Sequence, residues 1–392
     1  MIYPANFEEK IGFDRIREQV TALCSTPSAK AKLAEEGFST SADEIERRLS
    51  LMNEMRSLLM LERDFPDGDY PDPAPLVAKI RVEGSYLLAA EADQLRKALV
   101  TVGAIAEFIL GRGGARYPRL WELSRRVTLF PEIVRAIDAI LDDRGEVKDS
   151  ASPELQQVRR AIREREGQAA KRLQQVLQRA KQAGIVDADA VLSVRDGRPV
   201  IPVAAANKRK LQGFIHDESA TGRTFYVEPV EVVEINNELK ELEYAERREV
   251  VKVLSAFTES IRPDAEAIAD AGDYLSSVDM IRAKARWALA NDAGKPILST
   301  DDRLELRTAR HPLLQQTLRA QGREVVPLDL ALDRRKHILV ISGPNAGGKS
   351  VCLKTTGLMQ YLFQCGYPVP ASEVSELPVF RSIFIDIGDE QS

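Results

Sequence analysis

The chain has few of the residues that disulfide-bonded, metal-binding or membrane proteins need. Its 392 residues include three cysteines and three histidines. The cysteines are Cys24, Cys352 and Cys365, an odd number without C-x-x-C spacing, so we expect reduced thiols in a cytoplasmic protein. No stretch of eighteen apolar residues occurs, and the first thirteen residues lack a basic, then apolar, then small-residue series. Neither export nor membrane insertion is indicated, and no membrane partner is expected.

The composition is that of a soluble globular protein, with 44% apolar and 29% charged residues. The length suggests two to four domains. The net charge of −5 is uneven, because residues 154–223 hold fourteen Lys and Arg against eight acids, which leaves +6 there and −11 elsewhere. A basic stretch in an acidic chain indicates a surface that faces a polyanion. A solvated helix face is the alternative interpretation.

The segment Gly343–Ser350, with the sequence GPNAGGKS, fits the phosphate-loop pattern G-x-x-x-x-G-K-[ST]. It follows the apolar run Ile338–Ile341 and precedes the helix-compatible run Val351–Phe363. A phosphate loop requires this context, since the strand delivers the turn and the helix N-terminus favours anions. The candidate nucleotide-binding residues are Gly343, Pro344, Asn345, Ala346, Gly347, Gly348, Lys349 and Ser350. Lys349 would reach the outer phosphates of ATP, and Ser350 would hold Mg²⁺.

Asp386 is a tempting candidate for the metal-linked carboxylate of such a site, because it follows the apolar residues Ile383–Ile385. That apolar run is short, and it is the next strand-like element after the phosphate-loop helix. We therefore interpret Asp386 as a decoy. Only 42 residues follow Ser350, so we expect the groups that complete phosphoryl transfer to be missing and this fragment to be inactive.

The patterns upstream are mainly helical. Residues 1–150 show helical apolar spacing at Phe7, Ile11, Ile16 and Val20 and again from Ile45, and Gly111–Gly114 reads as a turn between helices. Ser152 and Pro153 are typical of a helix start, and the apolar period then continues to Gly184. A second long helix is predicted from Val230 to about Ile261. Helices of this length must project or pair, and an antiparallel pair is the simplest arrangement.

Between these two helices the apolar period changes to two. Val191–Val203 and Leu211–Val227 each predict a hairpin, the first turning at Asp196-Gly197 and the second near Ser219–Gly222. The arm is thus expected to end in a small β tip. Its phosphate-contacting candidates are Arg195, Arg198, Lys208, Arg209, Lys210 and Arg223, with His216 and Phe214 nearby in the sequence.

The last part of the chain reads as the start of an α/β nucleotide-binding domain. Strands are predicted at Leu304–Thr308, Val325–Leu330 and His337–Ile341. The fold class is therefore multidomain and mainly α, with a helical core and lever, an antiparallel arm with a β tip, and the start of an ABC-type P-loop domain. The expected parts are a core at 1–150, a clamp arm at 151–255, lever return helices at 256–295 and the ATPase start at 296–392.

Three segments together resemble the MutS family of mismatch-repair ATPases: the loop Gly343–Ser350, the run Ala309–Leu313 and the run Ile383–Gly388. The order of core, arm, return helices and ATPase is also similar. The resemblance implies that Asp386 precedes the true metal-linked strand and that Gln391 lies near the γ-phosphate. No aromatic residue precedes Pro327, where family members often stack adenine, so the adenine contacts are left open.

The chain resembles the bacterial MutS-two branch, which lacks the mismatch-reading domains. The Phe-x-Glu letters occur at Phe7–Glu9 and Phe257–Glu259, but both positions suit packing or surface residues. The resemblance implies a dimeric ATPase that binds branched or duplex DNA and suppresses recombination. Full-length members end in a nuclease-like domain, which implies an endonuclease activity of the whole protein that the sequence leaves open. Some members are linked to stalled ribosomes, so an ATPase that grips ribosomal RNA is the alternative function.

His311 and Cys352 are further candidates for a functional role, and a coiled-coil ABC ATPase is an alternative architecture. His311 could lie near the nucleotide, but a lone histidine without neighbouring ligands is more often structural. Cys352 lies near a helix N-terminus that could lower its pKa, although a packed small residue is the simpler interpretation. A coiled-coil ABC ATPase of the chromosome-organising type is disfavoured, because its two helices would flank hundreds of residues.

Overall fold

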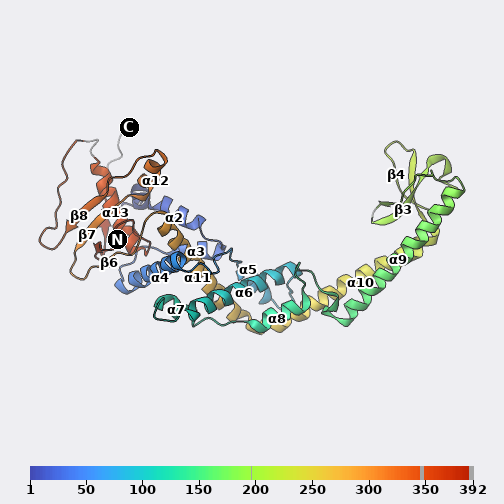
Figure 1. Ribbon diagram of the computed structural model, residues 1–392, viewed down its shortest axis with the longest axis horizontal. Coiled ribbons are helices and arrows are strands. Elements are labelled where there is room, and N and C mark those ends of the chain that lie inside the picture. The colour runs from blue at the N-terminus through green and yellow to red at the C-terminus, as the bar shows by residue number, and fades with distance from the viewer. Residues whose placement is uncertain (196, 345–347, 388–392) are drawn as a thin grey trace. The chain divides into compact units, whose positions relative to one another are not determined.

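A computed structural model describes residues 1–195, 197–344 and 348–387 of the chain. They form two compact, mainly α-helical units with small sheets (Figure 1). The first unit consists of Met1–Arg81, Gln94–Val134 and Pro263–Ser392, and the second of Val82–Asp93 and Arg135–Arg262. Every helix among the described residues is too short or too polar to span a lipid bilayer.

The first unit is built from helices whose starts are set by local capping. The Thr26 hydroxyl accepts a hydrogen bond from the Ala29 amide at 3.0 Å, and Ser41 does the same for Glu44 at 3.3 Å. The helices that lie in or enter this unit are α1 Phe7–Ile11, α2 Phe13–Ala22, α3 Pro27–Glu35, α4 Ala42–Leu61, α5 Ala74–Ile80, α6 Ala89–Gly111, α7 Pro118–Ser124, α8 Pro131–Ile140, α11 Ala265–Ala290, α12 Pro312–Ala320 and α13 Lys349–Gln364. The predicted break at Gly111–Gly114 is confirmed, because α6 ends at Gly111.

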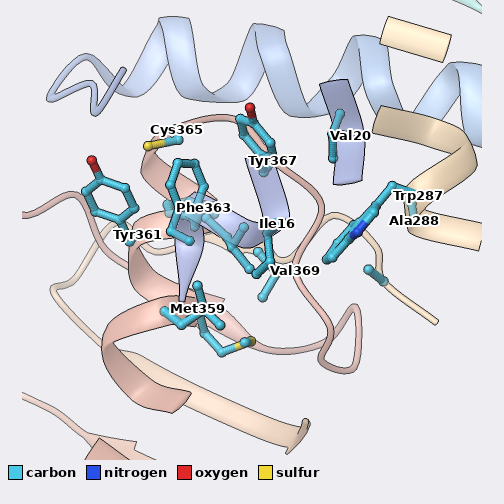
Figure 2. Close-up of a cluster of buried hydrophobic side chains, with 14 of the residues drawn as sticks. Ile16, Val20, Trp287, Ala288, Met359, Tyr361, Phe363, Cys365, Tyr367 and Val369 are labelled. Atoms are coloured by element: carbon cyan, nitrogen blue, oxygen red, sulfur yellow. The ribbon is translucent and has the colours of Figure 1, made fainter. Parts of the chain in front are cut away.

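A buried apolar cluster joins α2, α11 and α13 within the first unit (Figure 2). The spacing that predicted a helical core face at Phe7, Ile11, Ile16 and Val20 is confirmed, since all four side chains are buried. Segments far apart in the sequence meet here, and burial of such side chains is the main driving force of folding. The residues drawn with Ile16 and Val20 include Trp287, Ala288, Met359, Tyr361, Phe363, Cys365, Tyr367 and Val369.

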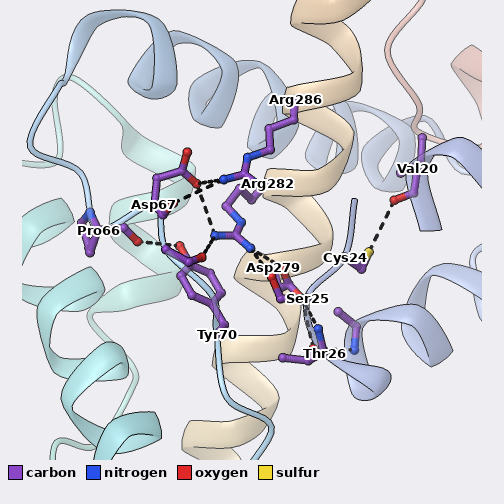
Figure 3. A network of polar contacts seen from close by, with 12 residues as sticks. Val20, Cys24, Ser25, Thr26, Pro66, Asp67, Tyr70, Asp279, Arg282 and Arg286 are labelled. Atoms are coloured by element: carbon purple, nitrogen blue, oxygen red, sulfur yellow. Dashed lines mark hydrogen bonds and ion pairs between the residues drawn. The ribbon is translucent and has the colours of Figure 1, made fainter. Parts of the chain in front are cut away.

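A charged side chain lies at the centre of a second, polar cluster in the same unit (Figure 3). Arg282 of α11 is fully buried, and its guanidinium lies 3.7 Å from the ring centroid of Tyr70. It donates to the Asp279 carboxylate at 2.8 Å, to the Ser25 hydroxyl at 2.7 Å and to the Gly68 carbonyl at 2.6 Å. A buried charge requires such partners, so this cluster fixes the 62–73 segment on α11.

The strands of the first unit form one small sheet and one parallel pair. The sheet has the order β6-β9-β7-β8, and β1 pairs with β10 through Ile2 opposite Ile383 and Tyr3 opposite Phe384. The predicted strand at Leu304–Thr308 is confirmed as β7. The strand bounds are β1 Ile2–Tyr3, β6 Ile297–Leu298, β7 Leu304–Ala309, β8 Leu328–Leu332, β9 Glu376–Leu377 and β10 Ile383–Phe384.

Two strand predictions need correction. β8 begins at Leu328 rather than Val325, directly after Pro327, which has no N–H for a ladder. The prediction of a strand at His337–Ile341 is wrong, because these residues have no strand hydrogen bonding and the side chains of Ile338 and Val340 are 75% and 83% exposed. A strand needs a neighbour for its backbone groups, and no strand in the described part of the chain pairs with this segment.

The second unit contains the two long helices, α9 Pro153–Gln182 and α10 Val230–Ile261. The Ser152 hydroxyl accepts from the Leu155 amide at 3.1 Å, which confirms the predicted cap. Three ion pairs join the helices: Arg159–Glu246, Arg165–Glu238 and Arg179–Glu231. From one pair to the next, the residue number increases on α9 and decreases on α10. The helices are therefore antiparallel, as predicted, and lie side by side (Figure 1).

A four-stranded antiparallel sheet lies between α9 and α10 in the sequence and packs at their shared end (Figure 1). It contains β2 Ser193–Arg195, β3 Arg198–Ala204, β4 Gly213–Glu218 and β5 Thr224–Pro229, in the order β2-β3-β5-β4. Both predicted hairpins are confirmed, although Asp196 in the first turn lies outside the described residues. One sheet face packs on α9, where Ile201, Val203 and Val227 join Leu173 and Val176. We call this sheet and its connections, residues 191–229, the tip.

Candidate functional site

The phosphate-loop candidate begins α13, a helix of 16 residues. Gly348 is its N-cap with a φ of 82°, and Gly343 has a φ of 149°. Both are backbone conformations that favour glycine, which explains the residue type at these two positions. The loop is exposed at Gly343, Pro344 and Gly348, while Asn345, Ala346 and Gly347 lie outside the described residues.

Lys349 is the first residue of α13, and its ammonium donates to the carbonyl oxygen of Gly343 at the start of the loop. The side chain is therefore turned toward the start of the loop. Ser350 follows it in the first turn and is half-buried. Amide groups of a first helical turn have no intrahelical partner, so this end of α13 has the donors and the positive dipole end that bind anions.

The far end of α13 is anchored in the first unit by buried polar contacts. Tyr361 donates to the carboxylate of Glu8 at 2.7 Å, and Arg17 holds that carboxylate with two contacts of 2.6 Å. Burial raises the pKa of Tyr361, so the phenol stays protonated and remains the donor. The Lys284 ammonium donates at 3.2 Å to the carbonyl of Gly366, just past the helix. These contacts attach the C-terminal end of α13 to the first unit.

Asp386 and Gln391 are the other two residues that the sequence connects with the nucleotide site. Asp386 is exposed and follows β10, and Gln391 lies outside the described residues. Within the described ranges, no group of three His, Cys, Asp or Glu side chains could hold a metal ion. A metal at this loop would accordingly depend on Ser350 and on oxygens of a bound phosphate.

His311 and Cys352 are both packing residues. Burial lowers the pKa of His311 to about 4, and its ring lies 3.8 Å from the point where a Cβ added at Gly12 would lie. A neutral histidine in this environment supports the structural interpretation. The idea that a helix N-terminus lowers the pKa of Cys352 is wrong, because burial raises it.

The basic residues of the arm differ in whether they already form ion pairs within the protein. Five arginines of α9 form ion pairs, which offsets much of the positive charge on the helical part of the arm: Arg159, Arg160, Arg163, Arg165 and Arg179. The exposed basic residues of the tip are Lys208, Arg209, Lys210 and Arg223. Lys208 and Arg223 lie near one another, since Lys208 stacks on the Phe225 ring at 4.5 Å and the Ala205 amide donates to the Arg223 carbonyl at 2.9 Å.

Arg198 and Arg195 have internal roles in the tip. Arg198 is bonded at 2.8 Å to Glu228, a carboxylate that is 1% exposed, and at 3.0 Å to Asn237. His216 and Asn236 also contact Glu228, each at 2.6 Å. Arg195 pairs with Asp217 at 2.9 Å and lies 3.9 Å from the centroid of the Tyr226 ring. The sequence showed the charges but gave no sign that Glu228 is buried and needs Arg198.

Sequence reasoning did not assign a role to Tyr226. The predicted hairpin contained it, and the alternation of the strand would have placed it on the same face as Glu228. The missing information was the tertiary arrangement of the tip, which brings the Arg195 guanidinium over the Tyr226 ring and beside Asp217.

Comparison with known proteins identifies the relatives of the chain. No family model matches it. Proteins named Endonuclease MutS2 match nearly all of it: 34% identity over 382 residues for Bacillus velezensis, 34% over 384 for Pelotomaculum thermopropionicum and 35% over 393 for Thermomicrobium roseum. These alignments cover 97%, 98% and 97% of this chain and 48% of each relative. The chain thus spans about half the length of the curated relatives it matches, and it belongs to the MutS family, in its MutS2 branch.

Proposed function

We propose that this chain binds ATP and Mg²⁺ at the loop Gly343–Ser350 and binds DNA through its tip. The position of Lys349 is the main support for nucleotide binding. Lys349 begins a 16-residue helix, and its ammonium donates to the Gly343 carbonyl at the start of the loop. The two described glycines have open space where a Cβ would lie, so phosphates can approach the backbone closely. Lys349 would hold the outer phosphates, and Ser350 would hold Mg²⁺, which offsets phosphate charge when bound.

The DNA part rests on the exposed cations Lys208, Arg209, Lys210 and Arg223 of the tip. Such side chains hold a phosphate backbone without reading its sequence. The arginines of α9 support this division, because acidic side chains already offset their charge. We propose duplex or branched DNA as the partner and suppression of recombination as the role, in line with the family.

Several properties of the whole protein belong to the same proposal. The relatives carry the name endonuclease, and we propose that the complete protein is a dimeric, cytoplasmic ATPase with nuclease activity. The exposed apolar side chains at Ile338–Ile341 support the idea that further strands cover this segment in a longer chain, since such patches mark interaction surfaces. The four-part division at residues 150, 255 and 295 also remains a proposal.

The nucleotide proposal is tested by titrating a fluorescent ATP analogue with Mg²⁺ into the chain. Lys349→Ala should weaken binding at least about tenfold, because a hydrogen bond to a charged group is worth about 1.5–3 kcal/mol. Lys336→Ala is the matched control, since Lys336 is exposed and outside the loop. Asp386→Asn should also leave binding unchanged. Equal affinity for wild type and Lys349→Ala would overturn the proposal, and a loss with Asp386→Asn would show that this carboxylate is not a decoy.

A further inference from the structure

One face of the tip sheet combines aromatic and basic side chains. Phe214 on β4 lies opposite Glu228 on β5, and Tyr226 is two residues from Glu228 on the same strand. Cross-strand partners and alternate residues of a strand share a sheet face. Phe214, Tyr226 and Glu228 therefore point to one side. Arg195 lies on this side too, because its guanidinium stacks on the Tyr226 ring at 3.9 Å.

This aromatic face is the side of the sheet opposite the apolar core of the tip. The intervening residues Phe225 and Val227 belong to the cluster that packs on α9. Phe214 is 59% exposed even though it is an aromatic residue on an ordered strand. β4 is an edge strand of the sheet, so no further strand among the described residues covers Phe214.

Basic side chains lie on both faces of the sheet. Arg195 lies on the aromatic face, whereas Lys208 lies over the ring of Phe225, which packs toward the apolar core on the other face. Arg223 directly precedes β5, at the end of that strand away from the position opposite Phe214. The distance along β5 from Thr224 to that position is about 13 Å, at about 3.3 Å per residue. A single strand bound over Phe214 thus has Arg195 on the same face and Arg223 within a few nucleotides of length.

We propose that Phe214 and Tyr226 stack against unpaired bases, so that the tip prefers single-stranded segments of DNA over fully paired duplex. Paired bases in a duplex expose only their edges, whereas an unpaired base exposes its ring faces. Sequence-tolerant binding of single strands combines basic side chains with aromatic ones, and both are present here. The stacked Arg195–Tyr226 pair adds a rigid planar surface beside the exposed Phe214 ring.

The inference rests on the proposed DNA-binding function, and the test separates the two. Fluorescence anisotropy compares three probes with the 392-residue chain: a single-stranded oligo-thymidine, a fork with two such arms, and a blunt duplex of the same length. We expect the wild type to bind the oligo-thymidine and the fork more tightly than the duplex. Phe214→Ala should weaken binding to those two probes at least about fivefold, from the loss of one stacked base, and leave duplex binding unchanged.

Matched variants distinguish stacking from loss of structure. Phe214→Trp should preserve binding, Phe214→Leu should behave like Phe214→Ala, and Ile215→Ala is the control, because Ile215 is the 51% exposed neighbour on the opposite face. Circular dichroism should be the same for all four variants. Duplex binding equal to oligo-thymidine binding, with no effect of Phe214→Ala, would overturn base stacking and leave phosphate binding intact. Absence of binding to all three probes would overturn the proposed function as well.

Discussion

The side-chain amide of Gln364 donates a hydrogen bond to the carbonyl oxygen of Ser39 at 2.9 Å, at the opposite end of the helix that begins with Lys349. Gln364 is fully buried, and the Ser39 amide donates back to its carbonyl at 3.0 Å. The same side chain contacts the Phe380 carbonyl at 2.8 Å and the Phe380 amide at 3.1 Å. One glutamine therefore connects the candidate nucleotide helix with two distant segments of the first unit.

Gln364→Leu should lower the free energy of unfolding by about 2 kcal/mol or more. The leucine is similar in size, but it leaves the buried Ser39 carbonyl and the partly buried backbone groups of Phe380 without their partner. Each unsatisfied buried group costs about 1–3 kcal/mol. Urea unfolding followed by circular dichroism measures the change. Gln321→Leu, at an exposed position, is the control and should have little effect. Equal stability of the two variants would mean that the Gln364 contacts contribute nothing net.

Arg282→Met should be more destabilising, by about 3–5 kcal/mol, because it leaves the buried Asp279 carboxylate without its cation. The Asp279 carboxylate would keep only the Thr26 amide and hydroxyl, at 2.8 and 3.1 Å. Arg286→Met is the matched control on the same helix, since Arg286 is 34% exposed and pairs with Asp67 at the rim of the cluster. A loss that is the same for both variants would contradict the central role of Arg282.

The tip should lose stability in acid through Glu228. Burial acts to raise the pKa of this carboxyl, but hydrogen bonds from Asn236, His216 and Arg198 outweigh burial and hold the pKa below its usual value. A lowered folded-state pKa stabilises the fold above the unfolded value of about 4.3, and this stability is lost as the pH falls through the folded value. The protection factors of the β5 amides, which correct for the intrinsic slowing of exchange in acid, should therefore fall below about pH 4. Glu228→Gln should remove this dependence, and Glu218→Gln, at an exposed position, should retain it.

The elements that sequence alone predicted are those set by neighbouring residues. The cap at Ser152, the apolar period of α9 and the strand pairs of the two hairpins are local, and the structure confirms each. Nothing local indicates that Ile2 pairs with Ile383 or that Gln364 contacts Ser39. These contacts depend on the packing of segments more than three hundred residues apart.

The errors have the same physical origin. Ile338–Ile341 has the apolar composition of a strand. It is not a strand in the structure, because it pairs with none of the described strands. In the tip, Arg198 was predicted to contact phosphates like the other cations. Its guanidinium instead contacts Glu228 and Asn237. Charge can be read from a sequence, but which charges are internally paired cannot.

The most direct test of the account is salt-titrated DNA binding by a variant with Lys208, Arg209 and Lys210 all changed to Gln. The account predicts weaker binding, equally for all sequences, and a slope of log affinity against log salt reduced by about 0.9 per lost phosphate contact, up to about 2.7. A triple control on α9, with Arg160, Lys171 and Arg172 changed to Gln, removes the same charge and should change the slope less. Neither protein should prefer a single mispair over a matched duplex. Unchanged affinity and slope in the tip variant would contradict DNA binding by the tip.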